Sequence, residues 1–439
     1  MNRCTYWTFL GLFLFLLVLL AVKLSLIGWS LGSDSLSYYA HLRSFAIDYD
    51  FDYTNEFRDF NPRNHAVPSP DAKTATGLIP NKFPIGPALL WTPFFLLAHG
   101  LTWLGLIVGF NLPANGYSIL YQLFIGLGAQ LYGLCGLYLI YRLLRLFYPL
   151  RHAILSVVVV SLSTNVVYYL TVESTMSHSF SLFAVALFIY FGTKTYRQKS
   201  AKQFFAFGLM GALMTLIRYQ NGLFMLFPLL ELADQLGAAK WSKENLIKAF
   251  GQGIVFLSGF LLGLIPQALV WKIIYGDLLL NTYGKKGFET KSHYFDILFS
   301  LNHGLIAWTP IILLCLLGLA FFIVEHRKLG LFFLLFFLAQ YHVNANWHGW
   351  SFGVSFSSRA FVNCTFVFCA GMAAILARSS RRMKYVVPVL LGFVVWNFLL
   401  IIQYALGYLP LQGDYSWGEI LENQILILKD MVHLLWSIV

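Results

Sequence analysis

Carboxylates cluster in one polar stretch of an otherwise apolar chain. Residues 30–83 hold seven of the 19 aspartate and glutamate residues, namely Asp34, Asp48, Asp50, Asp52, Glu56, Asp59 and Asp71. A carboxylate held next to a hydroxyl group can accept its proton and make the oxygen a nucleophile. The stretch therefore predicts acid–base chemistry on a hydroxyl-bearing substrate. Asp34, which directly follows the first apolar segment, is placed to accept such a proton.

Asp34 also has a structural interpretation. It lies in SDSLSYY, where it is placed to cap a helix that begins at Ser35, a role that aspartate fills well. The two roles are compatible. Tyr38 and Tyr39 follow in the same segment, and we predict that they contact the substrate.

The segment DYDFDYTNEF has acidic residues at alternate positions from Asp48 onward, as a calcium-binding loop does. The sixth position is Tyr53 where an EF-hand has glycine, and the twelfth is Asp59 where it has glutamate. An EF-hand is therefore not predicted. Asp48, Asp50 and Glu56 remain candidates for substrate binding or for a looser divalent-cation site. The alternative is a solvated acidic loop.

Three cations stand at the predicted outer ends of apolar segments, namely Lys82, Arg218 and Arg359. A charged side chain at such a place usually has a partner or a ligand. The guanidinium group matches phosphate geometry well. The phosphate or pyrophosphate of a lipid would suit them as a ligand, and ion pairing with exterior carboxylates is the alternative.

Five further residues are substrate-binding candidates. Glu173 and His178, in TVESTMSHSF, lie at a predicted outer turn and could bind a metal, a sugar hydroxyl or a phosphate. Lys285, in YGKKGFETKSHYF, could meet an anionic head group. His348 and Trp350 lie in WHGWSFG, whose aromatic rings suit stacking on a sugar. Tryptophan at the membrane interface is the alternative interpretation of that loop.

Apolar helices must position these residues. Of the 439 residues, 58% are hydrophobic and 11% are charged, against about 25% charged residues in soluble domains. Runs such as LFLFLLVLLAV suit membrane-spanning helices, whereas an outer-membrane barrel would show alternating segments of about ten residues. The composition excludes a soluble enzyme, a disordered chain and a disulfide scaffold. The predicted fold class is an all-α polytopic membrane protein.

We predict about 11 transmembrane helices, within a range of roughly 10 to 13, with the N-terminus inside and the C-terminus outside. The predicted spans are residues 5–28, 117–141, 152–171, 177–193, 203–218, 222–237, 249–275, 303–324, 330–345, 360–377 and 385–409. Residues 411–439 form an amphipathic tail, for which we predict an interfacial helix.

Charge sets the orientation. The net charge is +11, but the basic residues are spread over many short loops, so nucleic acid is not a predicted partner. The predicted spans place 17 of the 30 basic residues and only four carboxylates inside, which follows the positive-inside rule. This arrangement requires that residues 84–110 do not cross. We predict for them a broken interfacial or re-entrant helix, with breaks at Pro84, Pro87 and Pro93.

A first span followed by an exterior loop with an early aspartate, here Asp34, resembles the GT-C superfamily of integral-membrane glycosyltransferases. Its members include protein O-mannosyltransferases and lipid A aminoarabinose transferases, and the closer likeness is to bacterial members. NKFPIGPALLW, residues 81–91, resembles the Lys/His-Pro-Pro motif of that loop, which precedes a juxtamembrane helix that does not cross. The chain has Asp34-Ser35 where the mannosyltransferases have Asp-Glu, a departure that bears on the substrate more than on the class.

The resemblance implies a single GT-C-like domain over residues 1–439, with residues 30–110 as exterior catalytic loop and juxtamembrane helices. It implies inverting transfer of a sugar from a polyprenyl-phosphate donor to a lipid, glycan or protein hydroxyl, at the outer face of a bacterial cytoplasmic membrane. Asp34 would be the base, and the cations Lys82, Arg218 and Arg359 would hold the leaving phosphate. The donor carries a good leaving group, so no cofactor is required and a divalent cation is optional. Membrane lipids are the remaining partners.

Three alternatives remain. A transporter or flippase of a lipid-linked substrate would place charged sites and broken helices near the bilayer midplane, often in repeats. This chain instead concentrates polar residues in one exterior loop and shows no repeat. A glycan polymerase or ligase tends to use a late exterior loop, and the large loop here is early. A non-catalytic membrane scaffold is the third alternative.

Overall fold

The computed structural model describes residues 3–62, 67–69, 71–238, 242–280, 287–288, 291–411, 413 and 415–438. These residues form helices joined by turns and loops, and no strand occurs among them. Seven helical segments are long and apolar enough to cross a membrane: Arg3–Ile27, Gly86–Ile107, Ile119–Leu144, Lys243–Tyr275, Arg327–Ala345, Arg359–Arg378 and Ser380–Ala405. The predicted all-α membrane class is confirmed, and the number of spans stays a prediction.

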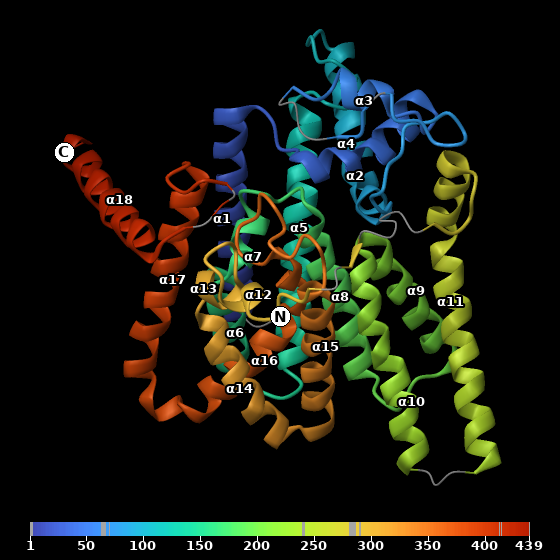
Figure 1. Ribbon diagram of the computed structural model, residues 1–439, viewed down its shortest axis with the longest axis vertical. Helices are drawn as coiled ribbons and strands as arrows, with labels where there is room; N and C mark the ends of the chain where they lie inside the picture. The colour runs from blue at the N-terminus through green and yellow to red at the C-terminus, as the bar shows by residue number, and fades with distance from the viewer. Residues whose placement is uncertain are drawn as a thin grey trace. The chain divides into compact units, whose positions relative to one another are not determined.

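The chain divides into two compact units. The first comprises Met1–Leu139 and Tyr169–Gly284. Its helices are α1 (Arg3–Ile27), α2 (Ser33–Arg43), α3 (Thr54–Arg58), α4 (Gly86–Ile107), most of α5 (Ile119–Leu144), α8 (Ser177–Lys194), α9 (Ala201–Ile217), α10 (Leu226–Ala238) and α11 (Lys243–Tyr275). Helices α8 to α11 lie side by side, and α2, α3 and α4 gather at one end of them (Figure 1).

Helices α9 and α11 pack through two glycines. A Cβ atom at Gly208 would collide with the carbonyl oxygen of Phe256, and one at Gly259 with that of Phe205. Only hydrogen at these positions allows the two backbones to approach so closely. The same helix pair buries Phe204 and Phe207 completely. This contact fixes the position of α9 against α11, and with it the position of the C-terminal end of α9.

A buried ion pair closes the opposite end of this unit. Lys199 Nζ lies 2.6 Å from Glu231 Oε2, and neither side chain is exposed. The exposed Ser200 then begins α9 with a capping box, in which its hydroxyl accepts from the N–H of Gln203 while the Gln203 side chain accepts from the N–H of Ser200. Arg197 pairs with Asp234 at 2.7 Å in the same region. These contacts tie the α8–α9 turn to α10.

Helix α4 differs from its prediction. It runs unbroken through Pro93, and Pro87 lies in its first turn, where a missing N–H costs no hydrogen bond. The indole N–H of Trp91 donates to the Ile125 carbonyl at 3.1 Å, so the first half of α4 packs along α5. The predicted break is wrong. Because α4 is also long and apolar enough to span, its interfacial placement stays a prediction.

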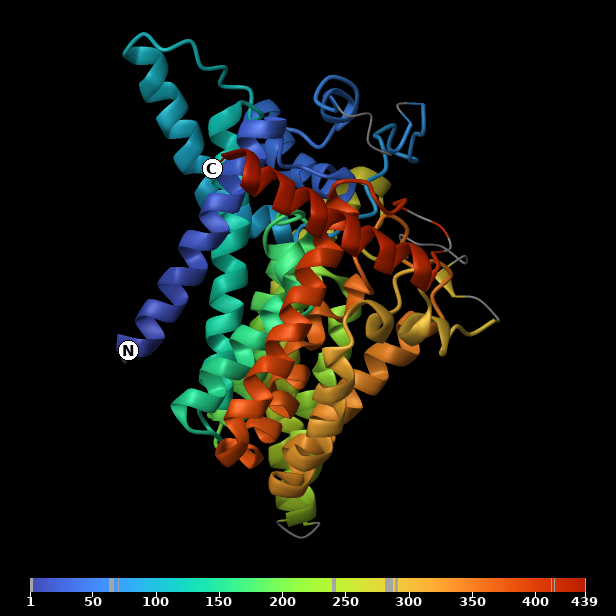
Figure 2. The ribbon, with the colours of Figure 1, turned by 90° about the vertical axis from the view of Figure 1, so that its left-hand side faces the viewer.

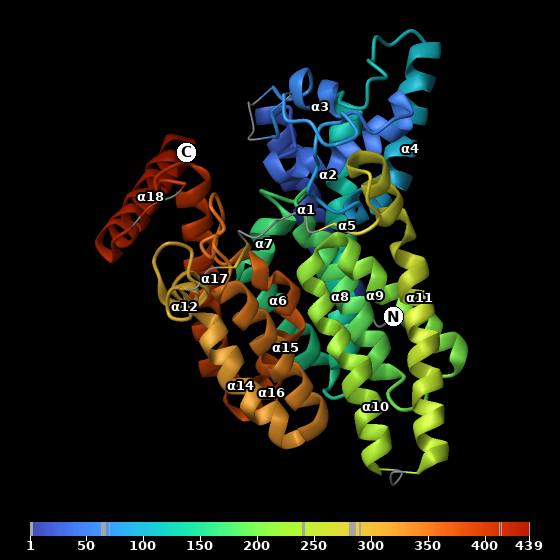
Figure 3. The ribbon, with the colours of Figure 1, turned by 45° about the vertical axis from the view of Figure 1, so that its right-hand side comes forward.

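The second unit comprises Ile140–Tyr168 and Lys285–Val439. Its helices are α6 (Leu150–Leu162), most of α7 (Asn165–Leu170), α12 (Asp296–Phe299), α13 (Leu305–Trp308), α14 (Ile311–Glu325), α15 (Arg327–Ala345), α16 (Thr365–Arg378), α17 (Met383–Ala405) and α18 (Trp417–Ile438). Helices α14, α15 and α16 lie side by side (Figure 3). Helix α18 leaves α17 at an angle (Figure 2), and its predicted interfacial placement stays a prediction.

Two predicted spans of this unit are interrupted. Residues 152–171 form α6 and α7 with a break at Ser163 and Thr164, and the amide of Asn397 donates to the carbonyls of Leu162 and Thr164 at 2.9 Å. Residues 303–324 become a continuous helix only from Ile311, because Pro310 disfavours helical geometry for the residue before it. Hydropathy alone does not report such breaks.

The α9–α11 contact yields a stability prediction. We expect Gly208→Ala to destabilise the protein by about 1–3 kcal/mol, because the added methyl group forces the backbones of α9 and α11 apart. Gly251→Ala is the matched control, since a Cβ atom at Gly251 in α11 meets nothing within 4 Å. Thermal unfolding in detergent measures both. Equal stability of the two variants would contradict the packing described above.

Candidate functional site

The end of α1 is tied to the turn before α8. Lys23 Nζ donates to the carbonyl oxygens of Ser30 at 3.2 Å and of Val172 at 2.6 Å. Thr175 Oγ1 donates to the same Ser30 oxygen at 2.7 Å. The N–H of Ser30, which is buried, donates to Gln122 Oε1 in α5 at 2.9 Å. Segments from three parts of the sequence therefore meet at Ser30.

Asp34 and Glu173 lie at the same end of α2. Helix α2 begins at Ser33 with Gly32 as its N-cap, so the predicted cap at Asp34 is wrong and Asp34 lies in the first turn. The helix dipole favours a carboxylate there. A Cβ atom at Gly32 would lie 2.9 Å from Glu173 Oε2, so only glycine leaves room for that carboxylate. The predicted base is thus accompanied by a second carboxylate from another segment.

One face of α2 carries Asp34, Tyr38 and His41, which are spaced four and three residues apart. The Tyr38 ring packs against Phe83 at 4.8 Å. The His41 Nε2–H donates to the Phe83 carbonyl at 3.0 Å, and its Nδ1 accepts from the Tyr53 hydroxyl at 2.7 Å. Burial lowers the pKa of His41 to about 4, so the imidazole is neutral at physiological pH.

Lys82 and Arg218 are on segments that touch. The Asn81 amide, next to the exposed Lys82, donates to the Ser37 carbonyl of α2 at 2.8 Å. Four residues after Lys82, the Gly86 backbone packs against Leu216, and a side chain there would collide with it. Arg218 follows directly as the C-cap residue of α9. The fold thus brings both cations to the end of the unit that carries α2.

Arg218 is held by neutral partners. Its Nη1 lies 2.8 Å from His178 Nδ1, and its Nη2 donates to Gln220 Oε1 at 3.0 Å. Because arginine can only donate, His178 accepts through Nδ1 and its imidazole is neutral. The His178 ring, which is buried, also packs on Tyr169 at 4.5 Å. These contacts orient the guanidinium.

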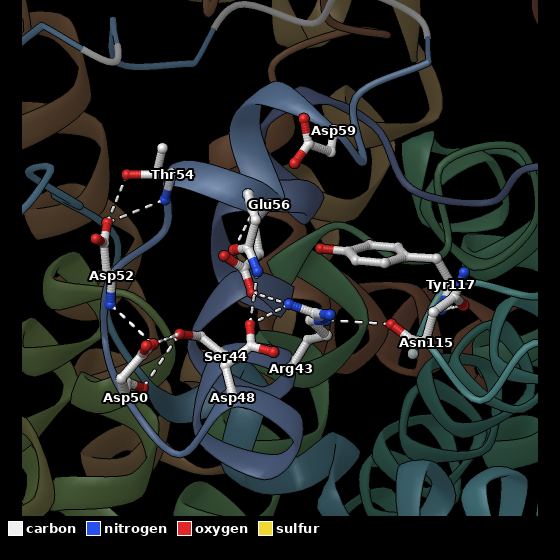
Figure 4. Close-up of polar contacts among 12 residues, drawn as sticks. Arg43, Ser44, Asp48, Asp50, Asp52, Thr54, Glu56, Asp59, Asn115 and Tyr117 are labelled. Carbon is white, nitrogen blue, oxygen red and sulfur yellow. Dashed lines mark hydrogen bonds and ion pairs between the residues drawn. The ribbon is translucent and has the colours of Figure 1, made fainter.

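The acidic run forms a network around Arg43 (Figure 4). Arg43 Nη1 donates to the Asp48 carboxylate and to Glu56 Oε1, the latter at 3.0 Å. Its Nε donates to the Asn115 carbonyl at 3.1 Å. One guanidinium therefore serves two carboxylates and joins the acidic loop to the segment before α5.

Two further acidic residues stabilise the loop itself. Asp50 Oδ1 accepts from Ser44 Oγ at 2.7 Å and from the Asp52 N–H at 3.1 Å. Asp52 Oδ1 in turn accepts from the Thr54 hydroxyl at 2.6 Å. Such local side-chain bonds are typical of turns. Asp48, Asp50 and Glu56, which the sequence offered as substrate or cation ligands, all have internal partners.

Glu56 is a completely buried carboxyl group. Burial raises its pKa to about 7 against the opposing effect of Arg43, and the neighbouring Asp48 raises it further. Among the described residues, its Oε2 atom has no hydrogen-bond partner. The carboxyl group therefore takes up a proton near neutral pH.

The other candidates have different surroundings. Tyr39 is fully buried, and its hydroxyl donates to the Gly116 carbonyl at 2.5 Å, which gives it a place in the core rather than at an accessible surface. Arg359 begins a 3-10 turn before α16 and belongs to the second unit. His348 and Trp350 lie in the loop after α15, also in that unit. Lys285 lies outside the described residues.

No group of three or more histidine, cysteine, aspartate or glutamate side chains that could hold a metal ion occurs in the described part of the chain.

Three residues of the site, Arg43, His41 and Ser30, were not predicted from the sequence. Arg43 carried a signal, since it stands five residues before Asp48 in a loop rich in carboxylates. His41 carried another, seven residues after Asp34 and so on the same helix face. Ser30 carried none, because its partners are distant in sequence.

Residues 122–271, about a third of the chain, match the family of dolichyl-phosphate-mannose-protein mannosyltransferases. The match includes Glu173, His178 and Arg218. The motifs that suggested the GT-C superfamily, at Asp34 and residues 81–91, lie outside this range, so the match supports that resemblance from a different part of the chain. The resemblance to membrane glycosyltransferases is confirmed.

Two solved structures of an oligosaccharyltransferase from Archaeoglobus fulgidus are similar to this chain. AglB in complex with an inhibitory peptide and a dolichol-phosphate has 12% identity and a TM-score of 0.47, over 98% of this chain and 55% of that chain. The complex with Zn and sulfate has 13% identity and a TM-score of 0.49, over 92% and 54%. The chain thus spans about half the length of both. No curated protein matches it.

The buried Glu56 yields a pH prediction. The unfolded chain ionises this carboxyl near its usual pKa of 4.5, and the folded protein at about 7. The stability that the protonated group provides below pH 4.5 is therefore lost as the pH rises to about 7. We expect the melting temperature to fall between pH 5 and pH 8, and to fall less in Glu56→Gln.

The control is Asp59→Asn. Asp59 is an exposed carboxylate whose pKa is lowered by the Arg58 guanidinium, so it stays ionised over that pH range. Its substitution should leave the slope of melting temperature against pH unchanged. A Glu56→Gln slope equal to that of the unmodified protein would rule out titration of Glu56 in this range.

Proposed function

We propose that this chain is a GT-C-type glycosyltransferase that moves a sugar from a polyprenyl-phosphate donor to a hydroxyl acceptor. The observation that carries the proposal is the meeting of Asp34, Glu173, Lys82 and the Arg218–His178 pair on touching segments at one end of the first unit. A base, a second carboxylate and two cations are the groups that this reaction requires. The family match over residues 122–271 supports the same class.

Asp34 is the proposed general base. Its carboxylate takes the proton of the acceptor hydroxyl, and the oxygen forms a bond to the anomeric carbon of the donor sugar. The bond between that carbon and the phosphate oxygen breaks on the opposite face, with its electron pair staying on the phosphate, so the configuration inverts. Asp34 then releases its proton to water or to the leaving phosphate. General base catalysis contributes typically about 10²- to 10⁴-fold.

Lys82 and Arg218 are the proposed phosphate ligands in this unit. The leaving phosphate gains charge in the transition state, so cations aimed at it lower the barrier. His178 and Gln220 hold the Arg218 guanidinium in one orientation before the donor arrives. Arg359, the third cation of the sequence prediction, belongs to the second unit, and its role as a phosphate ligand stays a prediction. Half-buried Asp34 and exposed Lys82 are both accessible to a substrate.

A divalent cation stays optional in the proposal. Asp34 and Glu173 lie at one helix end, and two carboxylates suit a hard cation with additional water or phosphate oxygens. Two carboxylates alone do not enclose a cation, and the described residues contain no group of three or more side chains that could hold a metal ion. A bound cation would add positive charge at the leaving phosphate. The residues of this chain otherwise bind the donor and move the acceptor proton without it.

The proposed orientation places this site outside the cytoplasm of a bacterium. The positive-inside asymmetry of the sequence supports it. The α8–α9 turn, with Lys194, Arg197, Lys199 and Lys202, lies at the other end of α8 from Glu173 and His178. The proposed acceptor is a lipid, a glycan or a protein, and membrane lipids surround the apolar helices.

The activity test compares the unmodified chain with Asp34→Asn. Purified protein in lipid is given a panel of radiolabelled polyprenyl-phosphate sugars, and sugar release or transfer is followed together with donor binding. We expect activity with one donor that falls about 10²- to 10⁴-fold in Asp34→Asn, while donor binding persists, because asparagine cannot take up the proton.

Asp59→Asn is the matched control, because it removes an exposed carboxylate of the same polar stretch, one that pairs with its neighbour Arg58. Its activity should equal that of the unmodified chain. Activity that survives in Asp34→Asn would reject Asp34 as the base. Absence of turnover and binding with every donor would reject the glycosyltransferase itself and favour a transporter or a scaffold.

The orientation test uses single cysteines. Cys4 and Cys135, the two exposed cysteines, are first replaced by serine. Ser69→Cys should then react with a membrane-impermeant maleimide in whole cells, and Gln198→Cys only after the membrane is opened. Gln198 is exposed and lies in the α8–α9 turn, and its substitution leaves the Ser200 cap of α9 intact. The reverse pattern would place the proposed site inside.

A further inference from the structure

Two indole rings of the loop after α15, both in the second unit, pack against residues of the segment 287–293. Trp350, in the loop after α15, stacks on His293 at 5.1 Å with an angle of 17° between the rings. Trp347 lies on the backbone of Gly287, where a Cβ atom would come within 2.8 Å of the ring. Both indoles are half-exposed. Each ring is thus backed by protein on one side and keeps accessible surface.

A chain of uncharged polar groups runs beside these rings. Ser292 Oγ donates to Asn346 Oδ1 at 2.6 Å, and the Asn346 amide donates to the Tyr294 hydroxyl at 3.2 Å. That hydroxyl lies 2.6 Å from His342 Nδ1. The hydroxyl oxygens and the second imidazole nitrogen have further hydrogen-bonding capacity. Ser292, Tyr294 and His342 are exposed, so a ligand can reach that capacity.

The loop that carries the two indoles ends in an unfavourable backbone turn. Phe352 has a φ of 62°, in the left-handed region that bulky residues rarely adopt, and Gly353 also has a φ of 62°. The Phe352 N–H donates to the Gly349 carbonyl at 2.8 Å. Residues held in such a conformation cluster at binding sites, where the surrounding structure imposes it. The turn therefore holds the Trp347–Trp350 loop in one shape.

We propose that Trp347, Trp350, Ser292, Asn346, Tyr294 and His342 form a carbohydrate-binding surface. A sugar ring has an apolar C–H face, which packs on an aromatic ring, and a rim of hydroxyl groups, which bond to amides, hydroxyls and imidazoles. The six side chains match both features and have no permanent charge. A lipid chain would leave these polar groups without bonds.

The inference rests on the proposed function for the identity of the ligand. In a glycosyltransferase, a second sugar-binding surface holds the acceptor, so the acceptor assigned here is a glycan rather than a simple lipid or an unmodified protein. Binding of free sugar to the surface is independent of the transfer reaction. It can therefore be measured whether or not the chain transfers sugar.

The experiment measures binding of mannotetraose, maltotetraose and chitotetraose to the full chain in phosphatidylcholine nanodiscs by calorimetry. We expect one of them to bind, and Trp350→Ala to weaken it about tenfold, or about 1.4 kcal/mol, because the stacking on the indole is lost. Trp350→Phe should keep much of the affinity. Trp417→Ala, which removes an exposed indole on α18 in the same unit, should keep all of it.

A second variant guards against a folding defect. Asn346→Leu breaks the polar chain but keeps both indoles, and it should weaken binding while the melting temperature stays unchanged. The inference is overturned if no probe binds the unmodified chain, or if Trp350→Ala and Asn346→Leu bind as tightly as it does. Sugar binding without any transfer would reject the proposed function alone. Transfer with unaltered binding in both variants would reject this surface alone.

Discussion

The candidate site depends on one ammonium group. Lys23, near the end of an apolar helix, is bound by the carbonyls of Ser30 and Val172, which are 142 residues apart in the chain. A lysine on an apolar helix is stable only when its charge reaches a polar partner. Because Lys23 donates to a carbonyl in each of two loops, it joins the segment before Asp34 to the segment before Glu173. The hydrogen bonds of Lys23 thus hold together the two segments that carry Asp34 and Glu173.

Charge is treated differently in different parts of the first unit. Arg43 is shared between Asp48 and Glu56, and Lys199 is paired with Glu231, so these charges are compensated where they are buried. Arg218 is instead oriented by the neutral side chains of His178 and Gln220. A guanidinium that is already held in one orientation can bind an anion with little reorganisation.

The sequence predicted well whatever depends on local composition. Long apolar runs predicted most of the helices, and the first polar stretch predicted the position of Asp34, because hydropathy and residue type act over neighbouring residues. The predicted break in α4 was wrong because Pro87 occupies the first turn and the helix runs on through Pro93. The break between α6 and α7 was missed because Asn397 supplies the lost hydrogen bonds from a distant helix.

In the candidate site, too, the residue types could be predicted from local sequence, and the contacts between distant segments could not. The residue types at Asp34, Lys82 and Arg218 could be chosen from their places beside apolar segments. Their meeting could not be predicted, since it follows from the approach of Gly86 to Leu216 and of Glu173 to Gly32. Both approaches are steric events between segments remote in sequence. A single sequence has no local pattern that reports which distant backbone will need a glycine.

The buried Lys199–Glu231 pair has a consequence for how the chain assembles. A buried charge without its partner is strongly destabilising. The ammonium of the α8–α9 turn must therefore stay in water until Glu231, 32 residues later, has been synthesised. At ribosomal speed that interval is roughly two to six seconds. Helices α8 and α9 therefore cannot close the end that carries Lys199 before α10 arrives, so the three helices mature as one unit during translation.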